Sequence, residues 1–542
     1  MPSPAPSSLE STEARDSWLP MIVIAMGQML MSFNVAALPV SMSGMVKSFN
    51  TQPTTVGTAI VLYSLGVSGF ILLGAKLSQR FGAKIFFQIA VGMLAVAMLL
   101  MVLSPTAEIM LAAQAIAGMG AAGLVPTLVV LIANHYRGKQ QAEAVGWLGS
   151  ARAIAGVLAF VLVGFLAMIN WRLAFALLIV HSVAILLLSR RLKPSAPNPD
   201  VKIDGFGVIL AATGIILITF GFNNVRNWGL LLARPAAPTD LLGVSPAPIM
   251  IVVGIVIMTA FFVWTHRRAA NKKTPLLALE VVDSPREWAT VIALFAIVAT
   301  EAAINFSVPL YIQIVQGRSS MATSIAMMPF MLTVFFTAIL IVRLYNRFSP
   351  RTIARVAFTL VIIGTTWLAF VASNNWSVLP VVVGLLTVGL GQGALVTLLF
   401  NVLVTAAPKE LAGDVGSLRG VTQNLAAAVG TALMGALLVG VLSTLIHSEL
   451  TDNEMFPPQF KQGELAGEFN LDNINFINND QLTTRLGATS ATAEQVEEAV
   501  RINSESRLRA LKTGFLMLAG VSLLALVPCN WLPNYRPGEI TA

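Results

Sequence analysis

The chain has 542 residues, of which 56% are hydrophobic and only 11% are charged. Because a water-soluble domain carries about 25% charged residues, this composition excludes a water-soluble protein and indicates lipid as the solvent. The net charge of +8 does not predict a nucleic-acid partner, since the basic residues fall in alternate loops and form no single patch. The single cysteine, Cys529, excludes an internal disulfide and a cysteine-cluster metal site.

A membrane-spanning helix needs roughly 20 apolar residues, and on that measure the chain divides into about fourteen spans. In chain order we expect them at 18–42, 54–77, 84–104, 107–133, 143–168, 173–189, 207–224, 249–266, 288–314, 323–345, 352–372, 379–405, 415–446 and 511–532. The sequence therefore predicts an all-α polytopic membrane protein with two six-helix bundles and two linker helices.

The loops predict the orientation and the domain order. By the positive-inside rule, we expect the loops rich in Lys and Arg and both termini to lie on the cytoplasmic side of a bacterial inner (plasma) membrane. Residues 1–17 are polar and carry acidic residues where a leader would be basic, so we expect no cleavable signal peptide. The predicted order is a cytoplasmic tail at 1–17, an N-terminal six-helix bundle at 18–189, two linker helices with their loops at 190–287, a C-terminal six-helix bundle at 288–532 and a cytoplasmic tail at 533–542.

Residues 447–510 form the one sizeable hydrophilic insertion in the C-terminal bundle, and it is rich in Asp and Glu. The count of spans predicts that it lies outside the cytoplasm. Its second part, from Thr492 to Leu511, has no Gly or Pro and is expected to form an amphipathic helix. The insertion is interpreted either as a solvated spacer or as a docking surface, for which a periplasmic adaptor protein is a candidate partner.

A ten-residue phrase occurs twice, at 75–84 and 342–351, with Leu, Arg, Phe and a terminal base in register. A duplicated membrane bundle would leave such a repeat, and transporters built from two parallel halves have it. Its basic residues are interpreted either as a cytoplasmic latch between helices that move or as charges that fix the topology. These residues are Arg80, Lys84, Arg347 and Arg351. Gln79 and Asn346 share one register position, so both copies lack a carboxylate and any acidic partner must come from elsewhere.

Several short motifs occur in a characteristic order. They are 34–39 (NVAALP), 118–122 with Pro126, Trp171-Arg172, Asp204 with Gly207, Trp228-Gly229, and 309–313 (PLYIQ) with Gly317 and Ser319. In these motifs the chain resembles the major facilitator superfamily, in particular its fourteen-helix drug:proton antiporter branch, over roughly residues 20–446 and 511–532. The resemblance implies two six-helix bundles around a central cavity that opens to alternate sides.

The chain also departs from the family pattern. Gln79 stands where the cytoplasmic motif usually has Asp, and Gln114 stands where the fourth helix usually has Arg. The fifth-helix stretch 155–164 lacks the usual Gly-Pro, and 29–32 lacks the usual first-helix acid. The family's proton-handling residues are therefore largely absent from the first half.

Charged residues inside the expected spans are the strongest candidates for function. Burying a charge at mid-span costs about 2.5–3.5 kcal/mol on translocon scales, so intramembrane acids mark ion pathways. Glu301 lies near the middle of the ninth span and is predicted to bind a proton or a cationic substrate, although a carboxylate that only packs helices is the alternative. Arg152 either holds an anion, provides the counter-charge to Glu301, or extends towards the cytoplasmic face. Arg419, nearer the cytoplasmic end, is interpreted as a topology or latch residue.

Polar residues within the spans are candidates for lining the cavity, and hydrogen bonding between helices is the alternative for most of them. The candidates are Asn34, Gln114, Arg152, His181, Asn305 and Gln392. His181 has a side chain that can shuttle protons at neutral pH, but a lone histidine is more often hydrogen-bonded within a bundle.

No Walker, His-Glu-x-x-His or Gly-x-Ser-x-Gly motif is found, so we expect neither an enzyme nor a cofactor or metal. The leading hypothesis is a secondary-active, proton-coupled exporter of amphipathic drug-like or lipid-like molecules, with the lipid bilayer, the substrate and protons as its partners. An uncoupled facilitator or lipid-translocating protein of the same fold is the alternative. A membrane scaffold or sensor that acts through residues 447–510 is the third reading.

Overall fold

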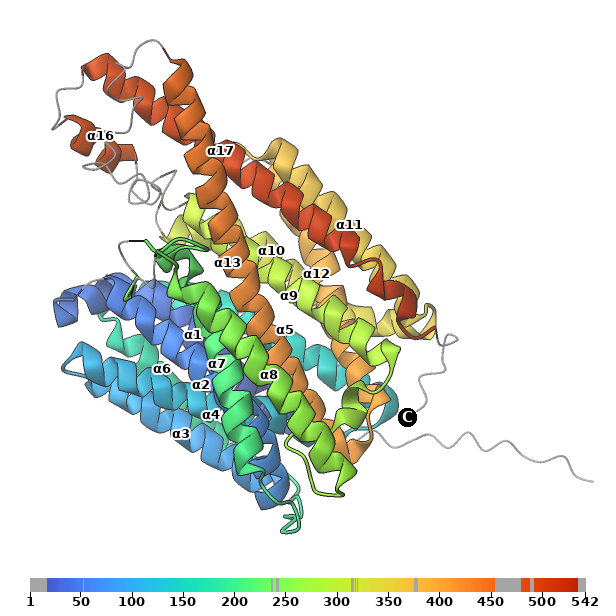
Figure 1. The fold of residues 1–542 in the computed structure, drawn as a ribbon. Coiled ribbons are helices and arrows are strands. Elements are labelled where there is room, and N and C mark those ends of the chain that lie inside the picture. The colour runs from blue at the N-terminus through green and yellow to red at the C-terminus, as the bar shows by residue number, and fades with distance from the viewer. Residues whose placement is uncertain are drawn as a thin grey trace, which may run out of the picture.

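The computed structural model describes residues 17–51, 53–234, 237–239, 243–312, 316, 318, 320–374, 379–453, 479–487 and 492–534. Fourteen of the helices in these ranges are long and apolar enough to cross a membrane (Figure 1). The same ranges contain no strand, so the predicted all-α polytopic fold is confirmed. Nearly all of the two predicted tails, much of the 447–510 insertion, and Gln313, Gly317 and Ser319 lie outside the described residues.

Six helices build the first bundle. They are α1 (Leu19–Phe49), α2 (Pro53–Phe81), α3 (Ala83–Leu103), α4 (Ala107–His135), α5 (Gly138–Ile169) and α6 (Arg172–Ser189). Helix α4 packs against both α2 and α3, while α1 packs against α5 and α6. The contact between α2 and α4 depends on small residues, since a Cβ at Gly118 would lie 2.4 Å from the Tyr63 carbonyl oxygen.

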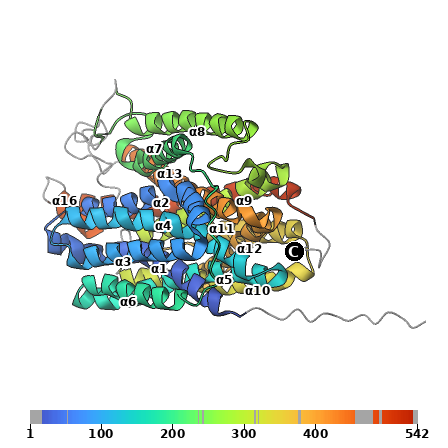
Figure 2. The same cartoon turned by 90° about the horizontal axis from the view of Figure 1, so that it is seen from below.

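Six further helices build the second bundle, and two linker helices join it to the first. The second bundle consists of α9 (Pro285–Leu310), α10 (Ser320–Leu340), α11 (Pro350–Val371), α12 (Leu379–Ala406), α13 (Ala412–Asp452) and α17 (Ala493–Leu524). The linker helices are α7 (Gly205–Trp228) and α8 (Pro246–Ala270). Helix α7 packs on α2 and α13, one from each bundle, and α8 packs on α7 at the margin of the molecule (Figure 2).

Asp204 ties the linker pair together. Its Oδ1 atom accepts a hydrogen bond from the Gly207 amide at 3.1 Å and so caps the first turn of α7. Its Oδ2 atom accepts one from Trp264 Nε1 of α8 at 2.9 Å. The aspartate and glycine of the sequence motif thus have a local structural role.

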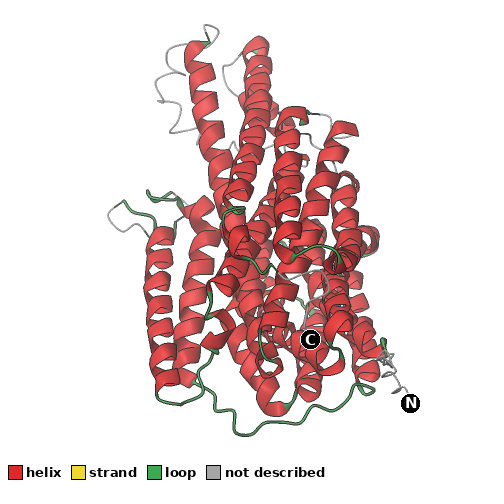
Figure 3. Ribbon diagram, turned by 90° about the vertical axis from the view of Figure 1, so that its right-hand side faces the viewer, coloured by secondary structure: helices red, strands yellow, loops and turns green. Residues whose placement is uncertain are grey.

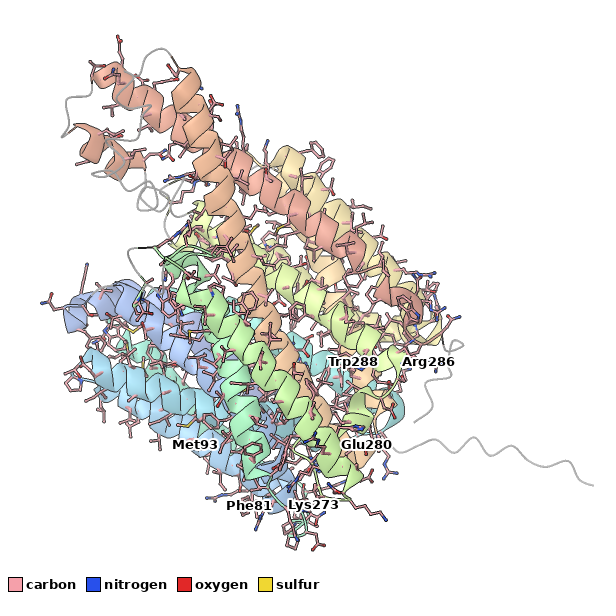
Figure 4. The ribbon with its side chains drawn as sticks, in the orientation of Figure 1. Phe81, Met93, Lys273, Glu280, Arg286 and Trp288 are labelled. Atoms are coloured by element: carbon pink, nitrogen blue, oxygen red, sulfur yellow. The ribbon has the colours of Figure 1, made fainter. Side chains whose placement is uncertain are left out.

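The two bundles meet near one end of the molecule. There α5 packs on α10, and the Ser150 hydroxyl donates to the Phe335 carbonyl at 3.1 Å. At the same end the last turns of α2 and the second half of α4 pack on the start of α13, where a Cβ at Gly416 would lie 2.9 Å from Pro126 Cα. Phe81, which ends α2, lies at this end with Lys273 and Glu280 of the α8–α9 connection (Figure 4). The loops at this end are those that the basic residues predict to be cytoplasmic.

Helices α13 and α17 project past the other membrane-spanning helices at the opposite end (Figures 1 and 3). With 41 residues, α13 is about 62 Å long at 1.5 Å per residue, roughly twice the hydrocarbon thickness. An ion pair of 2.8 Å between Arg509 and Glu449 joins the projecting ends. The amphipathic helix predicted from Thr492 is present, and it runs without a break into the last predicted span, so α17 begins about 18 residues before that span.

Gly430→Val is expected to destabilise the folded protein by about 1–3 kcal/mol, because overpacking forces the backbone to move. A Cβ at position 430 of α13 would lie only 2.2 Å from the Ala299 carbonyl oxygen of α9. Gly440→Val on the same helix is the matched control, since no heavy atom lies within 4 Å of a Cβ there. Thermal unfolding of the purified variants measures the difference, and an equal loss at both positions would contradict the prediction.

Candidate functional site

Three polar side chains meet inside the described spans, and they come from both bundles. Arg152 Nη2 of α5 donates to Glu301 Oε1 of α9 at 3.2 Å. Gln392 Nε2 of α12 donates to Glu301 Oε2 at 2.9 Å. We name Arg152, Glu301 and Gln392 the central cluster. Both carboxylate oxygens are engaged, and the ion pair joins the first bundle to the second.

The helices that carry the central cluster are positioned by local sequence. Helix α9 starts with a capping box, in which Ser284 and Glu287 satisfy amide groups of the first turn. Gln392 lies between Gly391 and Gly393, where an added Cβ would lie 2.5 Å and 2.6 Å from carbonyl oxygens of α11 and α10. These glycines let α12 lie close to two neighbours and direct Gln392 towards α9.

The central cluster is partly accessible. The exposed fraction of the side chain is 36% for Arg152 and 15% for Glu301, although both lie well within their helices. A proton or a polar group of a ligand can therefore reach the carboxylate. The structure thus brings together three residues that the sequence suggested separately, including Arg152 as the counter-charge.

The remaining polar candidates lie apart from the cluster or next to it. Asn34 of α1 and Gln114 of α4 exchange two amide hydrogen bonds of 3.0 and 3.3 Å, and both residues are fully buried. His181 Nε2 lies 3.0 Å from the Met26 carbonyl, which joins α6 to α1. These contacts have the geometry of helix-to-helix hydrogen bonding. Asn305 follows Glu301 by one turn of α9, and its buried Oδ1 has no partner among the described residues.

The repeated basic phrase makes equivalent contacts in the two bundles. Lys84, at the start of α3, donates to the carbonyls of Arg190 and Leu192 at 2.8 and 2.7 Å, just after α6. Arg351, at the start of α11, donates to the carbonyl of Leu532 at 3.1 Å, and Leu532 ends the short 3-10 helix Pro528–Trp531 that follows α17. Each base therefore fastens the third helix of its bundle to the end of the sixth, where carbonyl groups lack helical partners.

These contacts lie within the bundles and not between them. The side chains of Arg80 and Arg347 form no hydrogen bond or ion pair with any other described residue. Among the described residues, the four predicted latch residues therefore make no hydrogen bond or ion pair that connects the two bundles. Their role in transport stays a prediction.

An ion pair that sequence reasoning missed does connect the bundles. Lys76 Nζ of α2 lies 2.9 Å from Asp414 Oδ1 of α13, and the exposed fractions of the two side chains are 4% and 0%. Lys76 belongs to the repeated phrase, and Asp414 is the acidic partner from elsewhere that the phrase requires. The signal was obscured because the predicted thirteenth span began at 415, which left Asp414 in a loop. Helix α13 in fact begins at Ala412.

A model of the Major Facilitator Superfamily matches residues 24–431 of the chain. The multidrug efflux pump LfrA of Mycolicibacterium smegmatis is 23% identical over 425 residues, which cover 78% of this chain and 81% of that protein. The multidrug resistance protein Stp of Mycobacterium tuberculosis is 22% identical over 466 residues, which cover 85% and 82%.

Two solved structures have a similar fold. The human organic anion transporter MFSD10 (TETRAN) superposes with a TM-score of 0.57 at 13% identity, over 94% of this chain and 99% of that one. The proton:xylose symporter XylE superposes with a TM-score of 0.56 at 12% identity, over 96% of each chain. At these identities the likeness concerns the fold alone.

Proposed function

Because the chain belongs to the major facilitator superfamily, we propose that it exports an amphipathic, drug-like or lipid-like molecule across a bacterial inner membrane by alternating access, coupled to inward proton flow. That the protein is a membrane transporter follows from the family. The names of its multidrug efflux and resistance relatives support export. The observation that carries the coupling proposal is the Arg152–Glu301 ion pair between the two bundles.

The ion pair gives a simple coupling device. As a carboxylate, Glu301 attracts the Arg152 guanidinium and holds α5 to α9. Protonation of Glu301 removes the negative charge and weakens this bridge, which frees the bundles to rearrange. A substrate with a cationic or hydrogen-bond-donating group competes with the proton for the same carboxylate oxygens. Such competition is what exchange of a substrate for a proton requires.

The packing of the bundles supports an assignment of the conformational state. The contacts between α5 and α10 and between α2 and α13 lie near the end that carries the basic loops. If those loops are cytoplasmic, as the positive-inside rule predicts, the transporter is closed towards the cytoplasm. Both termini are then cytoplasmic, and the projecting ends of α13 and α17 face the periplasm. An adaptor protein that docks on them stays a prediction.

Transport in everted membrane vesicles tests the proposal. A growth-inhibition panel that compares an overexpressing strain with a deletion strain first identifies a transported compound. Uptake of the radiolabelled compound into everted vesicles is then expected only with an imposed proton gradient, and to cease when an ionophore collapses the gradient. Uptake that persists after collapse would instead support the uncoupled facilitator.

A further inference from the structure

A second guanidinium group lies near the central cluster, and no described residue accepts a hydrogen bond from it. Arg419 of α13 is only 4% exposed, and its Nε atom is buried without a hydrogen bond. Within the part of the chain that the structure describes, its side chain forms no ion pair. Its one specific contact is with the ring of Phe400 of α12, whose centroid lies 3.8 Å from the guanidinium carbon.

A buried cation without a counter-ion is costly. Contact with an aromatic ring offsets only part of the penalty for removing a guanidinium charge from water. The topology interpretation of Arg419 does not account for this burial, because a charge that only fixes orientation can remain in the polar interface. A latch interpretation would require an acidic partner, and no described residue provides one.

The nearby carboxylate is already in use. Glu301 interacts electrostatically with both Arg419 and Arg152, but its two oxygens are occupied by Arg152 and Gln392. Two guanidinium groups therefore share one carboxylate, which leaves an excess positive charge in this region. A single negative charge from a ligand would balance it.

A further donor marks where that charge would lie. Gln423 follows Arg419 by four residues, so the two side chains lie on the same face of α13. The Gln423 Nε2 atom is buried and has no hydrogen-bond acceptor among the described residues. Two neighbouring donors without acceptors have the chemistry of an anion site, because carboxylate and phosphate oxygens accept hydrogen bonds from both groups.

We propose that Arg419 and Gln423 form an anion-binding subsite for the acidic headgroup of the transported amphiphile, a carboxylate or a phosphate. The proposal rests on the proposed transport function and narrows its substrate class to amphiphiles that carry a negative charge. The subsite does not use the atoms of Glu301, so a hydrogen-bond-donating group elsewhere on the same amphiphile can still compete with the proton for that carboxylate. A neutral or purely cationic amphiphile would leave Arg419 unpaired.

Binding to the purified full-length protein in nanodiscs of zwitterionic lipid tests this without any gradient. The probe is radiolabelled laurate, and the competitors are methyl laurate and dodecyltrimethylammonium, which have the same chain length without the negative charge. We expect laurate to bind, and neither competitor to displace it at matched concentration. Arg419→Gln is expected to weaken laurate binding roughly ten- to a hundredfold, as the loss of a charge-assisted hydrogen bond predicts.

Further variants and ions separate the alternatives. Gln423→Leu is expected to weaken laurate binding several-fold, and Arg507→Gln, which changes another buried arginine, is expected to leave it unchanged. Laurate binding that is equal in the wild type and in both α13 variants would overturn the proposal. Chloride or inorganic phosphate that occupies the site as tightly as laurate would overturn the headgroup assignment and identify a structural counter-ion. Because no gradient is used, a failure of proton coupling would leave these results intact.

Discussion

Glu301→Gln is expected to abolish transport that is driven by an imposed proton gradient, reducing uptake into everted vesicles at least about tenfold. The amide has the same shape as the carboxylate and can still accept a hydrogen bond from Arg152, so we expect the fold to be retained. It cannot bind and release a proton, and it carries no charge to hold Arg152 between the bundles. Proton binding therefore no longer controls whether the ion pair between α5 and α9 forms.

Two controls accompany this prediction. One is a variant of a second carboxylate, and the other is a second kind of transport measurement. Glu108→Gln changes an acidic residue in the first turn of α4, away from the cluster, and is expected to leave uptake unchanged. Exchange of labelled for unlabelled substrate without a gradient is expected to survive in Glu301→Gln, because exchange needs no net proton movement. Gradient-driven uptake at the wild-type rate in Glu301→Gln would show that the coupling group lies elsewhere.

The position of the spans could be predicted from sequence because lipid sets a minimum apolar length. Most expected spans agree with the observed helices to within about five residues. The largest discrepancy is the start of the last span, where hydropathy detects only the part of α17 that faces lipid. The polar half, from Ala493 to Ala510, continues the same helix because it contains no Gly or Pro that would end it.

The candidate site could be predicted only in part. Glu301 was evident from the sequence because a carboxylate within an apolar span is expensive. The sequence offers Arg152 as its counter-charge only as one of three interpretations and does not link Gln392 to it, since the two residues lie 149 and 91 residues away along the chain and meet Glu301 only through the packing of three helices. The sequence favours a topology or latch residue at Arg419 because it does not reveal burial against the ring of Phe400.

Asp414→Ala is expected to be the most destabilising of these changes, at about 3–5 kcal/mol, because it leaves Lys76 as an uncompensated buried charge. Both side chains of this pair are almost fully removed from solvent, so salt or water does not replace the lost partner. A lower midpoint of thermal unfolding in detergent measures the effect. The exposed pair of Arg509 and Glu449 provides the control, since breaking an exposed ion pair costs about 0–1 kcal/mol.

The double variant Lys76→Met/Asp414→Leu separates stability from function. Replacing both members of a buried ion pair by apolar residues of similar volume is often neutral or stabilising, so we expect the midpoint to return to the wild-type value or above. An apolar contact between α2 and α13 lacks the directional hydrogen bonds of the ion pair, and its separation exposes apolar surface to water instead of charged groups that water solvates. If the pair serves only to stabilise the fold, transport recovers together with the midpoint. If the bundles must separate at this point in each cycle, the double variant is stable but its transport rate differs from that of the wild type. Measuring vesicle uptake and thermal unfolding on the same variant distinguishes the two outcomes.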